Sequence, residues 1–213
     1  MRTLIVATFA LSLSLPILGA TPPSAKQITA WAPAEVQQMG VQVENVVPVA
    51  LPNNEQAYLA SVSYENAGRN FQAGYLLVRP TLKQARALED FGGQYNKIRL
   101  LDDYGSSQSV LIIGGAGSGQ GSSAGSYSLV AFEGWESRTL YSAGEQDNTG
   151  NCGPEVQREC WGNRVFLNVF SVGGPGGRIG LVVTNVKYTS VDMESPHQYT
   201  QESQLVFVDH PAY

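Results

Sequence analysis

Hydrophobic and polar residues alternate along residues 58–64, whereas residues 72–78 are apolar at nearly every position. Alternation with a period of two predicts a strand with one covered face, and a continuous apolar run predicts a strand buried on both faces. Further short strands, separated by Gly, Asn, Asp and Ser, are predicted at 41–49, 97–101, 109–113, 127–132, 138–141, 164–170, 180–188 and 204–208. The pattern therefore predicts an all-β fold, either an antiparallel β-sandwich or a small propeller-like arrangement of blade-like repeats.

Helical signals are few. Residues 33–39 favour one or two helical turns with Gly40 as the stop, and the Pro- and Ala-rich residues 21–33 are expected to be a loose lead-in. In the segment 82–88, Leu82, Ala85 and Leu88 would share one face of a two-turn helix. The same segment also suits an outer strand, and the pattern leaves both interpretations open.

The first twenty residues have the pattern of an export signal. Arg2 supplies a positive charge, residues 4–18 are almost wholly apolar, and Gly19-Ala20 form a small-residue exit. Pro16 interrupts the apolar stretch and argues against a membrane anchor, which needs about 20 apolar residues. We expect a signal peptide at 1–20, a lead-in at 21–40 and one β-rich domain at 41–213. The expected location is the bacterial periplasm or the exterior, with no stable membrane anchor.

Composition narrows the class of protein further. Of the 213 residues, 43% are hydrophobic and 15% are charged, which excludes a disordered chain. The 13 Lys and Arg against 18 Asp and Glu give a net charge of −5. A sequence-independent nucleic-acid binder needs a basic face, so no nucleic-acid partner is expected.

Two cysteines agree with export. Cys152 and Cys160 are separated by seven residues, and an even pair at close spacing in an oxidising compartment predicts a structural disulfide. A metal site would need two further ligands, and the chain has only His197 and His210 as histidines. No metal and no cofactor are therefore expected.

A faint internal repeat carries a resemblance to a known family. Residues 98–113 and 167–183 share the layout strand, tight polar loop, buried strand, and residues 56–78 form a more divergent copy. The loop Asp102-Asp103-Tyr104-Gly105 before the apolar strand 110–114 resembles blades of FG-GAP or VCBS-type β-propeller repeats, in which such a loop binds calcium. Only Asp102 matches an acidic ligand position, so the resemblance implies blade-like architecture and no metal site.

The most conspicuous segment is the Gly/Ser tract at 114–126, which is predicted to be a long mobile loop. It lacks the Lys of a phosphate-binding loop, but residues 121–125 match Gly-x-Ser-x-Gly, with Ser123 at the nucleophile position. A loop of this kind is also a candidate for gripping a partner. The candidate contact residues are Gly117, Ser118, Gly119, Gln120, Ser122 and Ser123, together with the aromatic Trp135.

The sequence favours a non-catalytic binding protein, because it contains no convincing catalytic triad, metal cluster or cofactor loop. Exported β domains of this kind commonly present loops to a partner. The expected partner is another protein; one version is an inhibitor or immunity-type protein that neutralises a basic, cell-wall-acting enzyme. Two alternatives stay open: a carbohydrate- or surface-binding module using exposed aromatics, and a hydrolase using Ser123.

Overall fold

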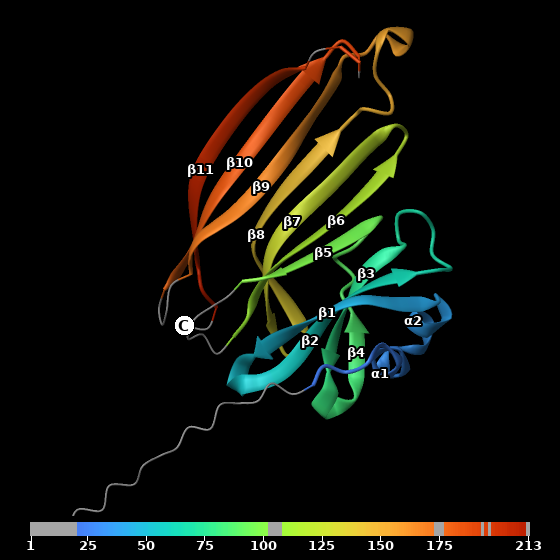
Figure 1. The fold of residues 1–213 in the computed structure, drawn as a ribbon, viewed down its shortest axis with the longest axis vertical. Coiled ribbons are helices and arrows are strands. Elements are labelled where there is room, and N and C mark those ends of the chain that lie inside the picture. Colours follow the sequence, from blue (N-terminus) through green and yellow to red (C-terminus); the bar gives the residue numbers. More distant parts are fainter. Residues whose placement is uncertain (1–20, 102–107, 173–176, 193, 196, 212–213) are drawn as a thin grey trace, which may run out of the picture.

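The computed structural model describes residues 21–101, 108–172, 177–192, 194–195 and 197–211, and Figure 1 shows their arrangement. The expected signal peptide and the Asp102–Gly105 loop lie outside these residues. The helices are α1 (Ala25–Trp31) and α2 (Ala34–Gln38), with single 3₁₀ turns at Pro52–Asn54, Pro80–Leu82 and Pro154–Val156. The strands are β1 (Val41–Leu51), β2 (Glu55–Tyr64), β3 (Ala73–Arg79), β4 (Gln84–Ala87), β5 (Tyr95–Leu100), β6 (Val110–Gly119), β7 (Ser122–Glu133), β8 (Glu136–Asp147), β9 (Cys160–Val172), β10 (Arg178–Ser190) and β11 (Gln198–Asp209).

These strands form two antiparallel sheets, which confirms the all-β prediction. The four-stranded sheet has the order β1-β2-β3-β4, and the seven-stranded sheet has the order β11-β10-β9-β8-β7-β6-β5. Each strand therefore pairs with its neighbour in the chain, apart from β4 and β5, which lie in different sheets. Two-residue turns, Gln120-Gly121 and Gly134-Trp135, join β6 to β7 and β7 to β8.

The seven-stranded sheet is bent at one corner. β8 and β9 pair only at Gln146↔Asn163 and Asp147↔Gly162, so the two strands separate along the rest of their length. As a result β9–β11, the outer layer, lie against one face of β5–β8, the middle layer. Side chains of the two layers share a core that includes Ile112, Leu129, Leu167 and Leu181. The two layers are therefore a sandwich made from one continuous sheet.

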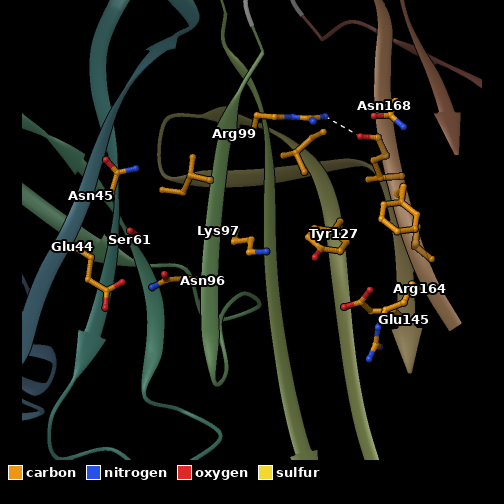
Figure 2. A pocket seen from close by; sticks show the side chains of 15 residues that line it. Glu44, Asn45, Ser61, Asn96, Lys97, Arg99, Tyr127, Glu145, Arg164 and Asn168 are labelled. Carbon is orange, nitrogen blue, oxygen red and sulfur yellow. Dashed lines mark hydrogen bonds between the residues drawn. The ribbon is translucent and has the colours of Figure 1, made fainter. Parts of the chain in front are cut away.

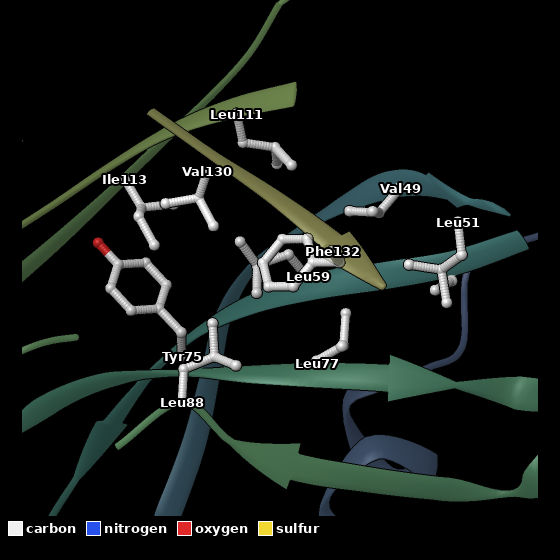
Figure 3. Close-up of a cluster of buried hydrophobic side chains, with 11 residues drawn as sticks. Val49, Leu51, Leu59, Tyr75, Leu77, Leu88, Leu111, Ile113, Val130 and Phe132 are labelled. Carbon is white, nitrogen blue, oxygen red and sulfur yellow. The ribbon is translucent and has the colours of Figure 1, made fainter. Parts of the chain in front are cut away.

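The other face of the middle layer packs against the four-stranded sheet. Leu111, Ile113, Val130 and Phe132 of the middle layer meet side chains from β1, β2 and β3 in a second core, drawn in Figure 3. β6 and β7 thus direct alternate side chains into two different cores. Their apolar character at consecutive positions follows from being covered on both sides.

The predicted lead-in is wrong for residues 25–31, which form α1. Ser24 and Gln27 make a reciprocal capping box at its start, and Ile28 is fully buried. α1 and α2 cover the far face of the four-stranded sheet, where Ile28, Ala32 and Val36 meet Leu76 and Val78. The continuous apolar run of β3 is therefore buried on both faces, as predicted. The helix predicted at 33–39 is confirmed as α2.

The helix interpretation of residues 82–88 is wrong, and the outer-strand interpretation is right. The 3₁₀ turn Pro80–Leu82 ends at Lys83, which has a left-handed backbone with φ of 51°. β4 then pairs with β3 as an edge strand, and its Ala85 is buried on the face of the sheet that α1 covers. A four-residue strand with one buried side chain carries too little periodicity to be separated from a short helix.

One hydroxyl group links the two sheets. Tyr75 on β3 is buried, and its hydroxyl accepts from the backbone N–H groups of Lys97 at 2.7 Å and Gly114 at 3.2 Å. It also lies within hydrogen-bond distance of the carbonyl oxygens of both residues, at 2.9 Å for Lys97. Burial raises the pKa of Tyr75 to about 12, so the hydroxyl keeps its proton and donates.

We predict that Tyr75→Phe lowers the free energy of unfolding by about 1–3 kcal/mol, because it leaves buried backbone groups of β5 and β6 without this partner. Urea unfolding followed by tryptophan fluorescence measures the change. Tyr199→Phe is the matched control, since Tyr199 is 66% exposed, and we expect it to stay within about 0.5 kcal/mol of wild type. Equal stability of Tyr75→Phe and wild type would show that the hydroxyl link is unimportant.

Candidate functional site

The Gly/Ser tract is a hairpin and not the predicted mobile loop. Residues 110–119 and 122–133 are strands, joined by the two-residue turn Gln120-Gly121. Both turn residues have positive φ, 51° and 78°, which is the backbone of a type I′ hairpin turn. Gly114 lies opposite Tyr127, and a Cβ at Gly114 would come within 2.9 Å of the Tyr127 ring. Glycine at this position leaves room for the Tyr127 ring within a regular strand. Composition alone does not distinguish this role of glycine from its role in a flexible loop.

The predicted contact residues Gly117, Ser118, Gly119, Gln120, Ser122 and Ser123 therefore lie together at one hairpin tip, which is anchored. Asn70 accepts from the Ser118 N–H at 3.0 Å and donates to its carbonyl at 2.9 Å. Gln94 donates to the Ser118 hydroxyl at 2.7 Å. On the β7 side, Ser123 Oγ donates to Asp147 Oδ2 at 2.7 Å.

Asp147 is the most strongly bound carboxylate at this tip. It is 4% exposed, and it accepts hydrogen bonds from Ser123, from Thr149 and from Arg164 at 3.0 Å. Burial alone would raise its pKa, but these hydrogen bonds outweigh burial and lower the pKa to about 2. A carboxylate held ionised in this way is a weak base at neutral pH.

The alternative of a Ser123 nucleophile receives no support from this geometry. Among the described residues, Ser123 hydrogen-bonds to Asp147 and to no imidazole. His197 stacks on Tyr199 at 5.9 Å and meets Tyr188 edge-on at 5.4 Å, while His210 is buried. β7 continues as a strand after Ser123, whereas the nucleophile elbow requires a strand-to-helix turn.

The structure does not bring Trp135 together with the hairpin tip. Trp135 follows the turn at Gly134, at the opposite end of the 12-residue β7, roughly 35 Å from the tip at a strand rise of about 3.4 Å. The guanidinium carbons of Arg79 and Arg86 lie 4.9 Å and 4.6 Å from the centre of its ring. Trp135 is also packed against the core between the sheets, so its contacts are structural.

The predicted disulfide is confirmed. Cys152 and Cys160 are bonded, with their Cα atoms 5.0 Å apart, and the bridge closes the loop that precedes β9. Asn148 fixes the base of this loop by donating to the Glu159 carbonyl at 2.9 Å and accepting from the Trp161 N–H at 2.7 Å. The loop is therefore held at the corner where β8 and β9 meet.

The outer layer presents an apolar face that sequence reasoning missed. Ile179, Leu181 and Val183 of β10 point into the core, so the alternate positions on β9–β11 point away from it. Four large side chains on this outer face are about half exposed or more: Phe166 (53%), Phe170 (52%), Leu205 (65%) and Phe207 (49%). Phe170 and Phe207 meet edge-on at 5.9 Å, and a Cβ at Gly180 would come within 2.6 Å of the Phe170 ring. These four side chains lie on the same face of the outer layer, and we call them the outer-face patch.

A cleft lies beside β5, between the first sheet and β9 (Figure 2). Its volume is about 850 Å³. Figure 2 shows Asn96 directed toward Glu44 and Ser61, whereas Lys97 is directed toward Tyr127. Arg99 donates to the Leu167 carbonyl at 3.0 Å and so joins β5 to β9 across the cleft. Amide groups therefore lie on one side of β5 and cationic and phenolic groups on the other, and apolar side chains such as Ile98 and Val165 complete the lining. Such a lining suits a small molecule with both polar and apolar surface.

No metal centre emerges within the part of the chain that the structure describes, since no three His, Cys, Asp or Glu side chains gather there. Asp102, the one position matching a calcium ligand in the resembling family, lies outside those residues.

We predict that Asp147→Asn lowers the free energy of unfolding at pH 7 by about 1–3 kcal/mol, because its donors lose a charged, buried acceptor. The folded pKa of about 2 lies below the ordinary value of 3.8, so the carboxylate stabilises the fold above pH 4. Its contribution disappears as pH falls from about 4 to about 2, and wild type and variant converge there. Urea unfolding across this pH range measures both effects.

Asp209→Asn is the control, because Asp209 also pairs with an arginine but is 85% exposed. We expect this substitution to change stability by less than about 0.5 kcal/mol at any pH. A pH-independent difference between wild type and Asp147→Asn would contradict the assignment.

Comparisons with family models, with curated proteins and with solved structures gave no significant match for this chain.

Proposed function

We propose that this chain is an exported, non-catalytic binding protein that holds another protein against the outer face of β9–β11. The observation that carries the proposal is the outer-face patch. Phe166, Phe170, Leu205 and Phe207 are half-exposed apolar side chains on one face of a regular sheet. Contiguous exposed apolar patches on a protein surface commonly mark interaction sites.

The exposure of these apolar side chains is unusual because the other apolar faces of the layers are covered. Side chains between α1 and the first sheet, between the two sheets, and between the middle and outer layers are all packed in cores. Among the described residues, only the outer face of β9–β11 combines large apolar side chains with a regular sheet and no covering layer. A protein partner would supply that layer.

The chemistry of the face defines the surface of the partner. The charged residues at its margin, Arg178 and Asp209, are paired with each other at 3.2 Å. The face itself is therefore close to neutral, and it suits an uncharged apolar surface. A basic, cell-wall-acting enzyme as the partner is supported by the net charge of −5 and not by this face.

One observation supports export. The Cys152–Cys160 bridge fits an oxidising compartment. Among the described residues, no helix has the length and apolar character needed to cross a membrane.

We predict that Leu205→Lys abolishes capture of the partner from an extract of exported proteins of the native cell. It places a charge in the centre of the outer-face patch while Leu205 is 65% exposed, so the fold is retained. Ser122→Lys, at the exposed hairpin tip, is the matched control and keeps the captured proteins. Quantitative mass spectrometry of both eluates against wild type identifies proteins that depend on the patch.

The same pair of variants separates the two candidate surfaces. Loss of capture with Ser122→Lys and not with Leu205→Lys would assign the contact to the hairpin tip and overturn the proposal. If neither variant changes the set of captured proteins, neither the outer-face patch nor the hairpin tip is the contact site.

The cleft beside β5 favours a second candidate function, the binding of an oligosaccharide or a similar polar molecule. Lys97 lines the cleft, is exposed, and among the described residues has no carboxylate within ion-pair distance.

If the cleft binds a glycan, Lys97→Ala should weaken binding about tenfold or more on an array of soluble glycans, as expected for loss of a charged hydrogen bond. Trp135→Ala should leave glycan affinity unchanged, since Trp135 lies away from the cleft. Equal affinity of Lys97→Ala and wild type for every glycan bound would count against the cleft.

A further inference from the structure

β11 is an open sheet edge. It is the last strand of the seven-stranded sheet, and Figure 1 shows it as the outermost strand of the outer layer. It pairs with β10 without interruption from Arg178↔Asp209 to Thr189↔Gln198. Residues 198–205 are all exposed. One long side of this strand is therefore available for backbone pairing.

One backbone hydrogen bond determines which residues of β11 face the open side. The His210 N–H donates to the Gly177 carbonyl at 3.3 Å, just beyond the paired Arg178 and Asp209. Backbone groups alternate in direction along a strand, so the even-numbered residues of β11 bond to β10. The odd-numbered residues direct their N–H and C=O groups to the open edge; these are Tyr199, Gln201, Ser203, Leu205, Phe207 and Asp209.

The edge also has few of the features with which proteins usually prevent strand addition. Residues 198–209 contain no Lys, Arg or Pro, and the pairing with β10 shows no bulge. Its two carboxylates, Glu202 and Asp209, are paired with Lys187 and Arg178 of β10. Unpaired charges and bulges are the common protection against edge-to-edge contact. A 12-residue, regular and partly apolar edge without them is a template for a further strand.

We propose that two copies of this chain pair through antiparallel β11 strands, with the two-fold axis at Ser203. Backbone direction and side-chain pairing together select this register. Only residues that face the edge can form hydrogen-bonded pairs, and Ser203 is the middle one of the five from Tyr199 to Phe207. Asp209, the sixth, is paired with Arg178 of its own copy. A two-fold axis there pairs all five residues of each copy, which amounts to about ten backbone hydrogen bonds.

The side chains fit the same register. Tyr199 lies opposite the second copy's Phe207, and this aromatic cross-strand pair forms twice. Gln201 lies opposite the second copy's Leu205. On the other face, Glu202 lies opposite the second copy's Gln204, so the carboxylates do not face each other. Centring the pair on Gln201 or Leu205 shortens the overlap and leaves one of the aromatic residues without a partner strand. Centring it on Gln204 would include Asp209, but Tyr199 would then lie opposite the charged Asp209 and Phe207 opposite Gln201, so both aromatic pairs would be lost.

The inference deepens the proposed function, and its meaning for partner binding rests on that function. Pairing through β11 turns two three-stranded outer layers into one continuous six-stranded face. The outer-face patch of each copy, at Leu205 and Phe207, is extended by Tyr199 and the adjoining His197 and Tyr188 of the second copy. The proposed partner would then meet two enlarged patches related by the two-fold axis.

A single-cysteine experiment tests the register. In Ser203→Cys the two introduced residues lie directly opposite, with Cα atoms about 5.5 Å apart, which a disulfide can span. In Gln201→Cys, on the same strand and face, the two residues are four positions apart along the strands, roughly 14 Å, which a disulfide cannot span. We expect copper-catalysed oxidation of the full chain to cross-link most of Ser203→Cys and almost none of Gln201→Cys. Cross-linking of neither variant, or of both equally, overturns the register.

Sedimentation equilibrium supplies an independent measurement. The wild-type chain should have twice the mass of one copy, and Ser203→Lys should raise the dissociation constant at least tenfold, because two ammonium groups then face each other at the axis. A wild-type monomer at all concentrations overturns the inference. A monomeric Ser203→Lys that still captures a partner leaves the proposed function standing. If the chain is a dimer and Leu205→Lys captures the same partner proteins as wild type, the proposed function is contradicted and the β11 pairing stands.

Discussion

The hydroxyl group of Tyr75 is the contact on which the layered arrangement depends. It sits in the core between the two sheets and bonds to backbone groups of both β5 and β6. Apolar packing between sheets is non-directional and tolerates sliding, whereas a buried hydroxyl with several backbone partners is satisfied at one relative position. Tyr75 therefore fixes where the middle layer lies on the first sheet, and with it the position of every later strand.

From that position, the bend at β8 and β9 decides which surface is left uncovered. Asp147 holds the bend: it pairs with Gly162 in the β8–β9 ladder and bonds to Arg164 on β9. The strands then diverge, and β9–β11 fold over the core that contains Leu129 and Leu181. A stack of layers has two ends. α1 and α2 cover one end, and the outer face of β9–β11 forms the other.

The sequence predicts strands well where burial follows one simple rule. β3 is apolar from Ala73 to Val78 because both faces of this stretch are buried, and that was predicted. The disulfide follows from the spacing of Cys152 and Cys160. The outer-face patch was missed because Phe166 and Phe170 make β9 look like another strand covered on both sides. Residue types alone do not tell which neighbouring layer is absent. The Gly/Ser tract was predicted to be a loop because glycine is common in flexible loops. In the structure Gly114 instead makes room for the Tyr127 ring within a strand, and residue type alone does not distinguish the two roles.

β11 shows how binding by an edge and binding by a face are connected in one strand. Backbone direction and side-chain direction alternate together, so the residues whose N–H and C=O groups face the open edge are also those whose side chains lie on the outer face. Any strand that adds to β11 must therefore continue the outer face and cannot be placed independently of it. A side-chain substitution such as Leu205→Lys alters the face and keeps the backbone edge. Strand pairing and face binding are thus separable by mutation although the same residues serve both.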